Sequence, residues 1–129
     1  MATIRNKKGH TSTKSAASTN ALDYHSARRD AATSFALLRE MLVLTREAEG
    51  KTTRAHHYAN EIRLVNRAFS GVAGPLDRDA MTAADLRVLT KLQVRDAALI
   101  GSGKAYAERK AMLADYAATL RPRLTGDLQ

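Results

Sequence analysis

The chain has no cysteine and no tryptophan, and it has only two prolines among its 129 residues. Without cysteine there is no disulfide, no thiolate metal site and no cysteine nucleophile, which fits a reducing compartment. No run of 18 apolar residues occurs, so the sequence predicts no membrane-spanning helix. The N-terminus lacks the apolar stretch of a secretory signal. We therefore expect a cytoplasmic or virion location rather than export by a signal peptide.

Residues that favour strands are also scarce. The chain has eight Val and Ile residues and six aromatic residues, against 24 Ala residues. Alanine is the best helix former, whereas β-branched and aromatic residues favour strands. The composition therefore predicts an all-α protein, and the length predicts one domain with a single modest core.

Acidic residues are absent from the first twenty positions. The basic residues there are Arg5, Lys7, Lys8 and Lys14, which supply half of the net charge of +8. Ser, Thr, Asn and Ala separate them, so the segment buries too little apolar surface to offset the entropy of ordering it. We predict that residues 1–19 form a flexible basic arm that neighbouring subunits or nucleic acid order. The same composition is also typical of an organellar transit peptide.

Apolar periodicity and turn residues predict four helices after the arm. Gly50, the Gly71–Pro75 segment and Gly101–Gly103 separate the helices, and Pro122 is expected to end the last one. Thr82 followed by Asp85 resembles a capping box at the start of the third helix. The predicted helices are residues 20–49, 53–70, 82–100 and 103–121, with a tail at 122–129. The short connection between the first two predicts an antiparallel hairpin, and the whole is predicted to be a four-helix bundle built on this hairpin.

The predicted core consists of one apolar face on each helix. In the first helix, this face is Ala27, Ala31, Phe35, Leu38 and Leu42. In the second, it is Ala55, Tyr58, Ile62, Val65 and Phe69. The third contributes Leu86, Leu89, Leu92, Ala97 and Ile100. The fourth contributes Tyr106, Leu113, Tyr116 or Ala117, and Leu120.

The first helix also carries a second apolar ridge, about 100° away from the first on a helical wheel. It consists of Leu37, Met41 and Leu44. A helix that is apolar over so much of its circumference is either central to the fold or covered on its second side by another subunit. The ridge is therefore a candidate oligomer interface.

Two short motifs resemble functional sites but lack required residues. Gly101-Ser102-Gly103-Lys104 resembles the end of a phosphate-binding loop, but Ala follows the lysine and the segment follows a helix rather than a strand. His56 and His57 with Glu61 provide too few ligands for a metal site. The other carboxylates, such as Asp96 beside Arg95, have the pattern of solvated helix surfaces. We therefore expect no catalytic site, no cofactor and no metal.

Arg87, Lys91 and Arg95 form a basic stripe along the third helix. Such a stripe can follow a phosphate backbone, or it can be an ordinary solvated face. No aromatic residue lies between the charges to stack on bases. The turn between the third and fourth helices also fits a helix-turn-helix, but no cluster of base-reading side chains opens the fourth helix.

These patterns favour a non-enzymatic structural subunit of a larger assembly. A virus or phage particle component, such as a head-to-tail ring subunit or an internal protein, fits the size and the arm by analogy. Its partners are expected to be further copies of the chain or other subunits, with nucleic acid as a candidate. One alternative is a small nucleic-acid-binding accessory protein, and another is a regulator or inhibitor that docks on a protein through the first helix.

Overall fold

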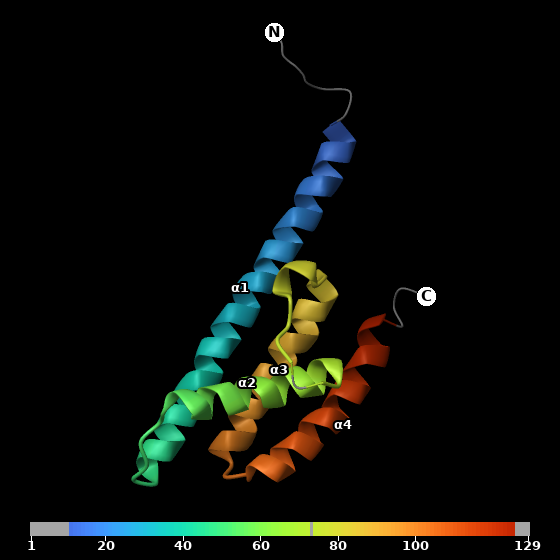
Figure 1. The fold of residues 1–129 in the computed structure, drawn as a ribbon. Coiled ribbons are helices and arrows are strands. Elements are labelled where there is room, and N and C mark those ends of the chain that lie inside the picture. The colour runs from blue at the N-terminus through green and yellow to red at the C-terminus, as the bar shows by residue number, and fades with distance from the viewer. Residues whose placement is uncertain (1–10, 73, 126–129) are drawn as a thin grey trace.

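The computed structural model of the protein describes residues 11–72 and 74–125. These residues form four α-helices and no strand, so the predicted all-α class is confirmed for them. A short 3-10 helix, η1, lies between α2 and α3. In chain order the elements are α1 (Thr11–Ala48), α2 (Ala55–Ser70), η1 (Arg78–Ala80), α3 (Ala83–Gly101) and α4 (Tyr106–Thr125) (Figure 1).

Glycine residues end α1 and α3, and a capping box begins α3, as the sequence predicted. Gly50 and Gly103 have φ angles of 77° and 81°, in the left-handed region that favours a residue without Cβ. After each glycine the backbone N–H reaches back five residues, from Lys51 to Arg46 at 2.8 Å and from Lys104 to Leu99 at 3.0 Å. This is the Schellman pattern. At the start of α3, Thr82 and Asp85 exchange side-chain to backbone hydrogen bonds, which confirms the capping box.

The start of α1 differs from the prediction. The helix begins at Thr11 rather than near residue 20, so residues 11–19 of the predicted arm belong to α1. The reason is that no Gly or Pro follows Gly9 until Gly50, and adding residues to an existing helix is much easier than nucleating one. Residues 1–10 of the predicted arm lie outside the described residues.

The end of α4 also differs. The helix continues through Pro122 to Thr125, so proline does not stop it at residue 121. Proline has a φ angle that a helix accepts, and its cost comes from one lost hydrogen bond and a clash with the carbonyl four residues earlier. So close to the end of a helix, few further hydrogen bonds depend on that turn.

The helices pack around α3, which contacts all three others. α1 runs alongside α3 in the same direction, α4 returns antiparallel to α3, and α2 crosses obliquely (Figure 1). The helical hairpin is therefore formed by α3 and α4, whereas α1 makes its most extensive contact with α3 rather than with α2. The physical reason is that α3 has buried side chains around much of its circumference, so it can take a helix on several sides.

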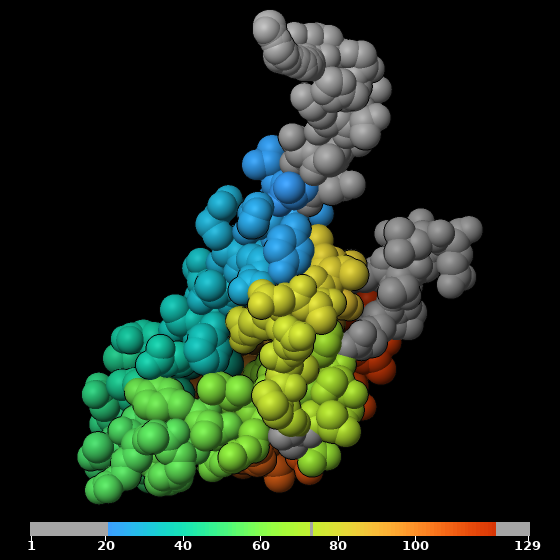
Figure 2. Space-filling model, turned by 45° about the horizontal axis from the view of Figure 1, so that its top comes forward, coloured from blue at the N-terminus to red at the C-terminus, as the bar shows by residue number. Residues whose placement is uncertain are grey.

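The buried residues confirm most of the predicted apolar faces, but the buried face of α2 differs from the predicted one. All five predicted residues of α3 are buried, as are Leu113, Ala117 and Leu120 of α4. Tyr106 was predicted to face inward and is instead 44% exposed. In α2 the buried face contains Glu61, Leu64 and Val65, while Ala55 is exposed. Figure 2 shows α2 and the residues after it covering one face of the molecule.

Candidate functional site

The N-terminal part of α1 extends past the other helices (Figure 1). With 38 residues, α1 is roughly 57 Å long at 1.5 Å per residue. Ala21, Leu22 and Asp23 are exposed, and from residue 21 onward the first buried residue of α1 is Ala27. Of the four basic residues predicted for the arm, Lys14 lies within α1, whereas Arg5, Lys7 and Lys8 lie outside the described residues. The N-terminal part of the α1 backbone thus lies beyond the ends of the other described helices (Figure 1).

The structure divides the second apolar ridge of α1. Leu37 is 46% exposed and Leu44 is 51% exposed, whereas Met41 is partly buried against the core. The Met41 side chain reaches Gly101 at the end of α3, where an added Cβ would lie 2.7 Å from its Cε atom. Met41 therefore contributes to packing within the subunit. The candidate interface on α1 is reduced to Leu37 and Leu44.

Two of the three cations in the basic stripe have partners inside the molecule. Arg87 forms an ion pair with Asp23 of α1, and the guanidinium of Arg95 lies 3.7 Å from the ring centre of Tyr116 on α4. Lys91 is exposed and has no ion pair among the described residues. This arrangement favours the solvated-face interpretation of the stripe over a phosphate-binding one.

Arginine side chains also cover aromatic rings elsewhere. The Arg39 guanidinium lies 5.1 Å from the ring centre of Tyr58 and 5.8 Å from that of Phe35. Arg78 lies 5.7 Å from the Phe35 ring as well, and Phe35 is half-buried rather than fully in the core as predicted. A ring covered in this way is not free to stack on a base.

The two rejected motifs have structural roles. Ser102 donates a hydrogen bond from Oγ to the Ala98 carbonyl at 2.8 Å, so the Gly-Ser-Gly segment ends α3. The Nδ1 atom of His57 accepts a hydrogen bond from the Arg54 backbone N–H at 2.9 Å, which satisfies a donor at the start of α2. The described residues contain no group of three or more His, Asp or Glu residues placed to hold a metal ion.

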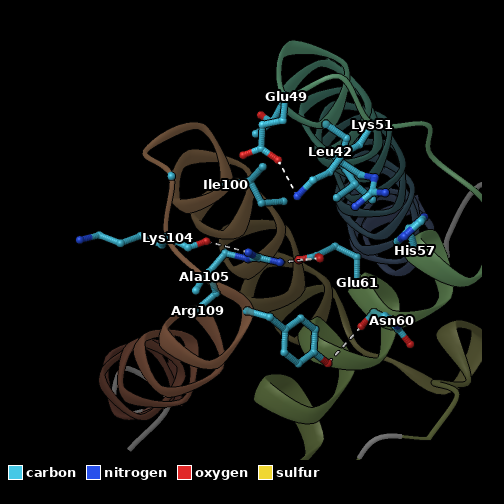
Figure 3. Close-up of a pocket in the computed structure, with 14 residues that line it drawn as sticks. Leu42, Glu49, Lys51, His57, Asn60, Glu61, Ile100, Lys104, Ala105 and Arg109 are labelled. Atoms are coloured by element: carbon cyan, nitrogen blue, oxygen red, sulfur yellow. Dashed lines mark hydrogen bonds and ion pairs between the residues drawn. The ribbon is translucent and has the colours of Figure 1, made fainter.

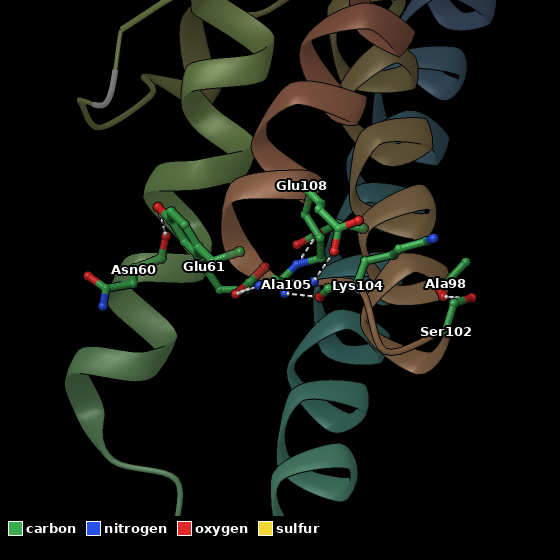
Figure 4. Close-up of polar contacts among 10 residues, drawn as sticks. Asn60, Glu61, Ala98, Ser102, Lys104, Ala105 and Glu108 are labelled. Atoms are coloured by element: carbon green, nitrogen blue, oxygen red, sulfur yellow. Dashed lines mark hydrogen bonds and ion pairs between the residues drawn. The ribbon is translucent and has the colours of Figure 1, made fainter.

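A buried charge cluster joins α2, α3 and α4, and sequence reasoning missed it. Arg109 donates from Nη2 to Glu61 Oε1 at 2.6 Å and from Nε to Asp96 Oδ1 at 3.1 Å. Its Nη1 atom donates to the Lys104 carbonyl at 2.8 Å, in the turn before α4. Figure 4 shows Glu61 reaching this turn from α2, where the Glu108 side chain also lies. One guanidinium therefore ties three helices together.

The cluster contains two carboxyl groups for one cation. Asp96 is 0% exposed and Glu61 is 5% exposed, so the expectation that Asp96 lies on a solvated face is wrong. Burial, with Glu61 as hydrogen-bonding neighbour and nearby negative charge, raises the pKa of Asp96 to about 9, and Arg109 only partly opposes this. A protonated Asp96 can donate to Glu61, and the cluster is then neutral. The buried oxygens Glu61 Oε2 and Asp96 Oδ2 have no other hydrogen-bond partner among the described residues.

The sequence carried a weak signal for this cluster. Asp96 follows Leu92 by four residues and precedes Leu99 by three, so it lies on the apolar face of α3. Glu61 precedes Leu64 by three residues and Val65 by four, so it lies on the apolar face of α2. A lone acid within an apolar face indicates a buried partner, because an unpaired buried charge is costly. The identity of that partner is not evident, since Arg109 is 48 residues away from Glu61.

Replacement of Asp96 by Asn is expected to change how stability depends on pH. Unfolded Asp96 loses its proton near its ordinary value of 3.8, whereas folded Asp96 keeps it up to about 9. Its contribution to the free energy of unfolding is therefore largest below pH 4 and falls as the pH rises toward 9. Asn resembles the protonated carboxyl and does not titrate. Relative to the wild type, Asp96→Asn should become steadily more stable across this range in urea unfolding.

The matched control for this prediction is Asp115→Asn, because Asp115 is an exposed aspartate on α4. Its stability relative to the wild type should change little over the same pH range. If the difference between Asp96→Asn and the wild type is flat from pH 4 to pH 9, Asp96 is not protonated in the folded protein.

Comparison of the chain with protein-family models, curated proteins and solved structures finds no match. Within residues 11–72 and 74–125, no helix is both long and apolar enough to cross a membrane. Function must therefore be inferred from the exposed surfaces, the charges and the pockets.

Proposed function

We propose that the protein is a non-enzymatic assembly subunit that associates with further copies of itself through α1. The observation that carries the proposal is that α1 extends past the other helices at its N-terminal end (Figure 1) and exposes Leu37 and Leu44 further along. A particle component of a virus or phage, such as a ring subunit or an internal protein, is the kind of assembly that fits this design.

Leu37 and Leu44 provide the apolar part of the proposed contact. Seven residues apart, they lie on the same side of α1, roughly 10 Å apart along its axis. This is the spacing by which helices pack side by side in coiled coils. Two half-exposed leucines bury little area in one contact, so a single pair of subunits is expected to bind weakly. Repetition of the contact in a many-membered assembly compensates for that weakness.

The N-terminal end of α1 provides the charged part. Its first turn contains no acidic residue, and the helix reaches Asp23 before the first acid. The positive end of the helix dipole adds to Lys14 and to the basic residues before the helix. An isolated helical end is marginal in water, so contact with an acidic surface would stabilise it. Nucleic acid remains the second candidate for this end alone, because Arg87 and Arg95 of the body are already engaged.

The proposal predicts that the protein self-associates and that Leu37→Asp with Leu44→Asp abolishes this. The double variant should keep the helical content and melting temperature of the wild type, because both side chains are about half-exposed. Light scattering at increasing protein concentration measures the molar mass, which should rise for the wild type and stay monomeric for the variant.

The control is Arg63→Asp with Arg67→Asp, two exposed positions on α2 that should leave association intact. A wild type that is monomeric at every concentration would overturn the proposal of self-association. Binding of DNA by that monomer, lost on removal of residues 1–19, would favour the nucleic-acid alternative. A double leucine variant that fails to fold would show that the ridge belongs to the core.

A further inference from the structure

A pocket of about 510 Å³ lies where the end of α1, the start of α2 and the α3–α4 turn meet (Figure 3). This volume is within the range of small-molecule sites. Leu42 and Ile100 give it an apolar wall, and Glu61 and Arg109 of the buried cluster form part of its lining. The proposed assembly contact does not use this pocket, since Leu37 and Leu44 are not among its lining residues.

The charges that line the pocket do not cancel. Arg109 is paired with Glu61 at 2.6 Å, and Lys51 is paired with Glu49 at 3.3 Å. These two pairs use both carboxylates of the lining. Arg46 lines the pocket and has no carboxylate partner among the described residues, and the same holds for Lys104. The pocket therefore has a net positive charge.

Arg46 is held in place but incompletely satisfied. Its Nη2 atom donates to the Thr52 carbonyl at 2.9 Å, across the turn that follows α1. Its Nε atom is buried and has no acceptor among the described residues. Because a guanidinium has five N–H donors and no acceptor, Arg46 retains donors that only an oxygen-bearing partner can satisfy.

His57 adds a neutral donor on the α2 side of the pocket (Figure 3). Burial and the nearby charge of Arg46 lower the pKa of His57, so the ring is neutral at physiological pH. Its Nδ1 atom accepts a hydrogen bond from the Arg54 N–H. In a neutral imidazole the other nitrogen then carries the proton, so Nε2 is a donor.

We propose that this pocket binds a small organic anion through its carboxylate or phosphate group. Arg46 and His57 Nε2 donate hydrogen bonds to the anionic oxygens, and the carbon part lies against Leu42 and Ile100. Carboxylate and phosphate share the required chemistry, namely negative charge and several acceptor oxygens. A cationic ligand would find both lining carboxylates already paired with cations.

The test is titration of the full chain with two probes, inorganic phosphate and butyrate, followed by two-dimensional NMR of backbone amides. Ionic strength is held constant with sodium chloride, so that general screening is the same at every point. At least one probe should give saturable shifts confined to the pocket, around Arg46, His57 and Lys104. Arg46→Gln and His57→Gln should each weaken that binding by about tenfold or more, because each removes a hydrogen bond to the anion.

Arg67→Gln is the matched control, because Arg67 is an exposed arginine of α2 outside the pocket. Its affinity should equal that of the wild type, and circular dichroism checks that each variant is folded. The proposal is overturned if neither probe gives saturable shifts with the wild type. It is also overturned if His57→Gln binds as tightly as Arg67→Gln, or if the shifts follow exposed cations over the whole surface.

Discussion

Arg109→Met is expected to lower the free energy of unfolding by about 3–5 kcal/mol at neutral pH. Arg109 is the only cation bonded to two buried carboxyl groups among the described residues, and its loss leaves Glu61 without a counter-charge. It also removes the hydrogen bond to the Lys104 carbonyl that fixes the turn before α4. The loss should be smaller at acid pH, because a protonated carboxyl has no charge to bury. Urea unfolding at two pH values measures both effects.

Lys110→Met provides the control, because Lys110 is the next residue on α4 and is exposed. It removes the same charge with a similar change of side chain, and its effect should stay within about 0.5 kcal/mol. If the two variants are equally stable, the cluster does not hold α2, α3 and α4 together. A loss that does not depend on pH would show that the contribution of Arg109 is packing rather than charge.

Leu38→Ala is expected to cost about 2–5 kcal/mol, whereas Leu37→Ala one residue earlier should cost no more than about 0.5 kcal/mol. Leu38 is 2% exposed in the contact between α1 and the core, and Leu37 is 46% exposed. The two substitutions remove the same atoms from the same helix, so helix propensity cancels in the comparison. Thermal and urea unfolding of the two variants measure the difference.

The same measurement tests the direction in which α1 faces. Equal losses at the two positions would mean that α1 is covered on both sides, and the proposed interface would then lie inside the subunit. Phe35→Ala should cost less than a fully buried phenylalanine, because Phe35 is half-buried beneath the guanidinium groups of Arg39 and Arg78.

Sequence patterns predicted the elements whose causes are local. Gly50 and Gly103 end their helices, and Thr82 begins one, because a left-handed glycine and a capping side chain act within a few residues of the chain. The apolar face of α3 was also predictable, since helical spacing alone defines it. The start of α1 and the end of α4 were not, because Thr11–Thr19 contain no residue that stops an existing helix, and Pro122 costs few further hydrogen bonds so close to a helix end.

By itself, then, the sequence determined that the described chain is all-α, that helices end near its glycine turns, and which residues form the apolar face of most helices. Only the tertiary structure decided that α1 packs on α3 rather than on α2, and that Met41 points into the subunit while Leu37 does not. It also decided that Glu61, Asp96 and Arg109 meet. Glu61 and Arg109 are 48 positions apart and meet only when the helices pack. Which helix faces pack depends on the interactions of all the helices with α3 at once, and a local sequence pattern does not contain that information.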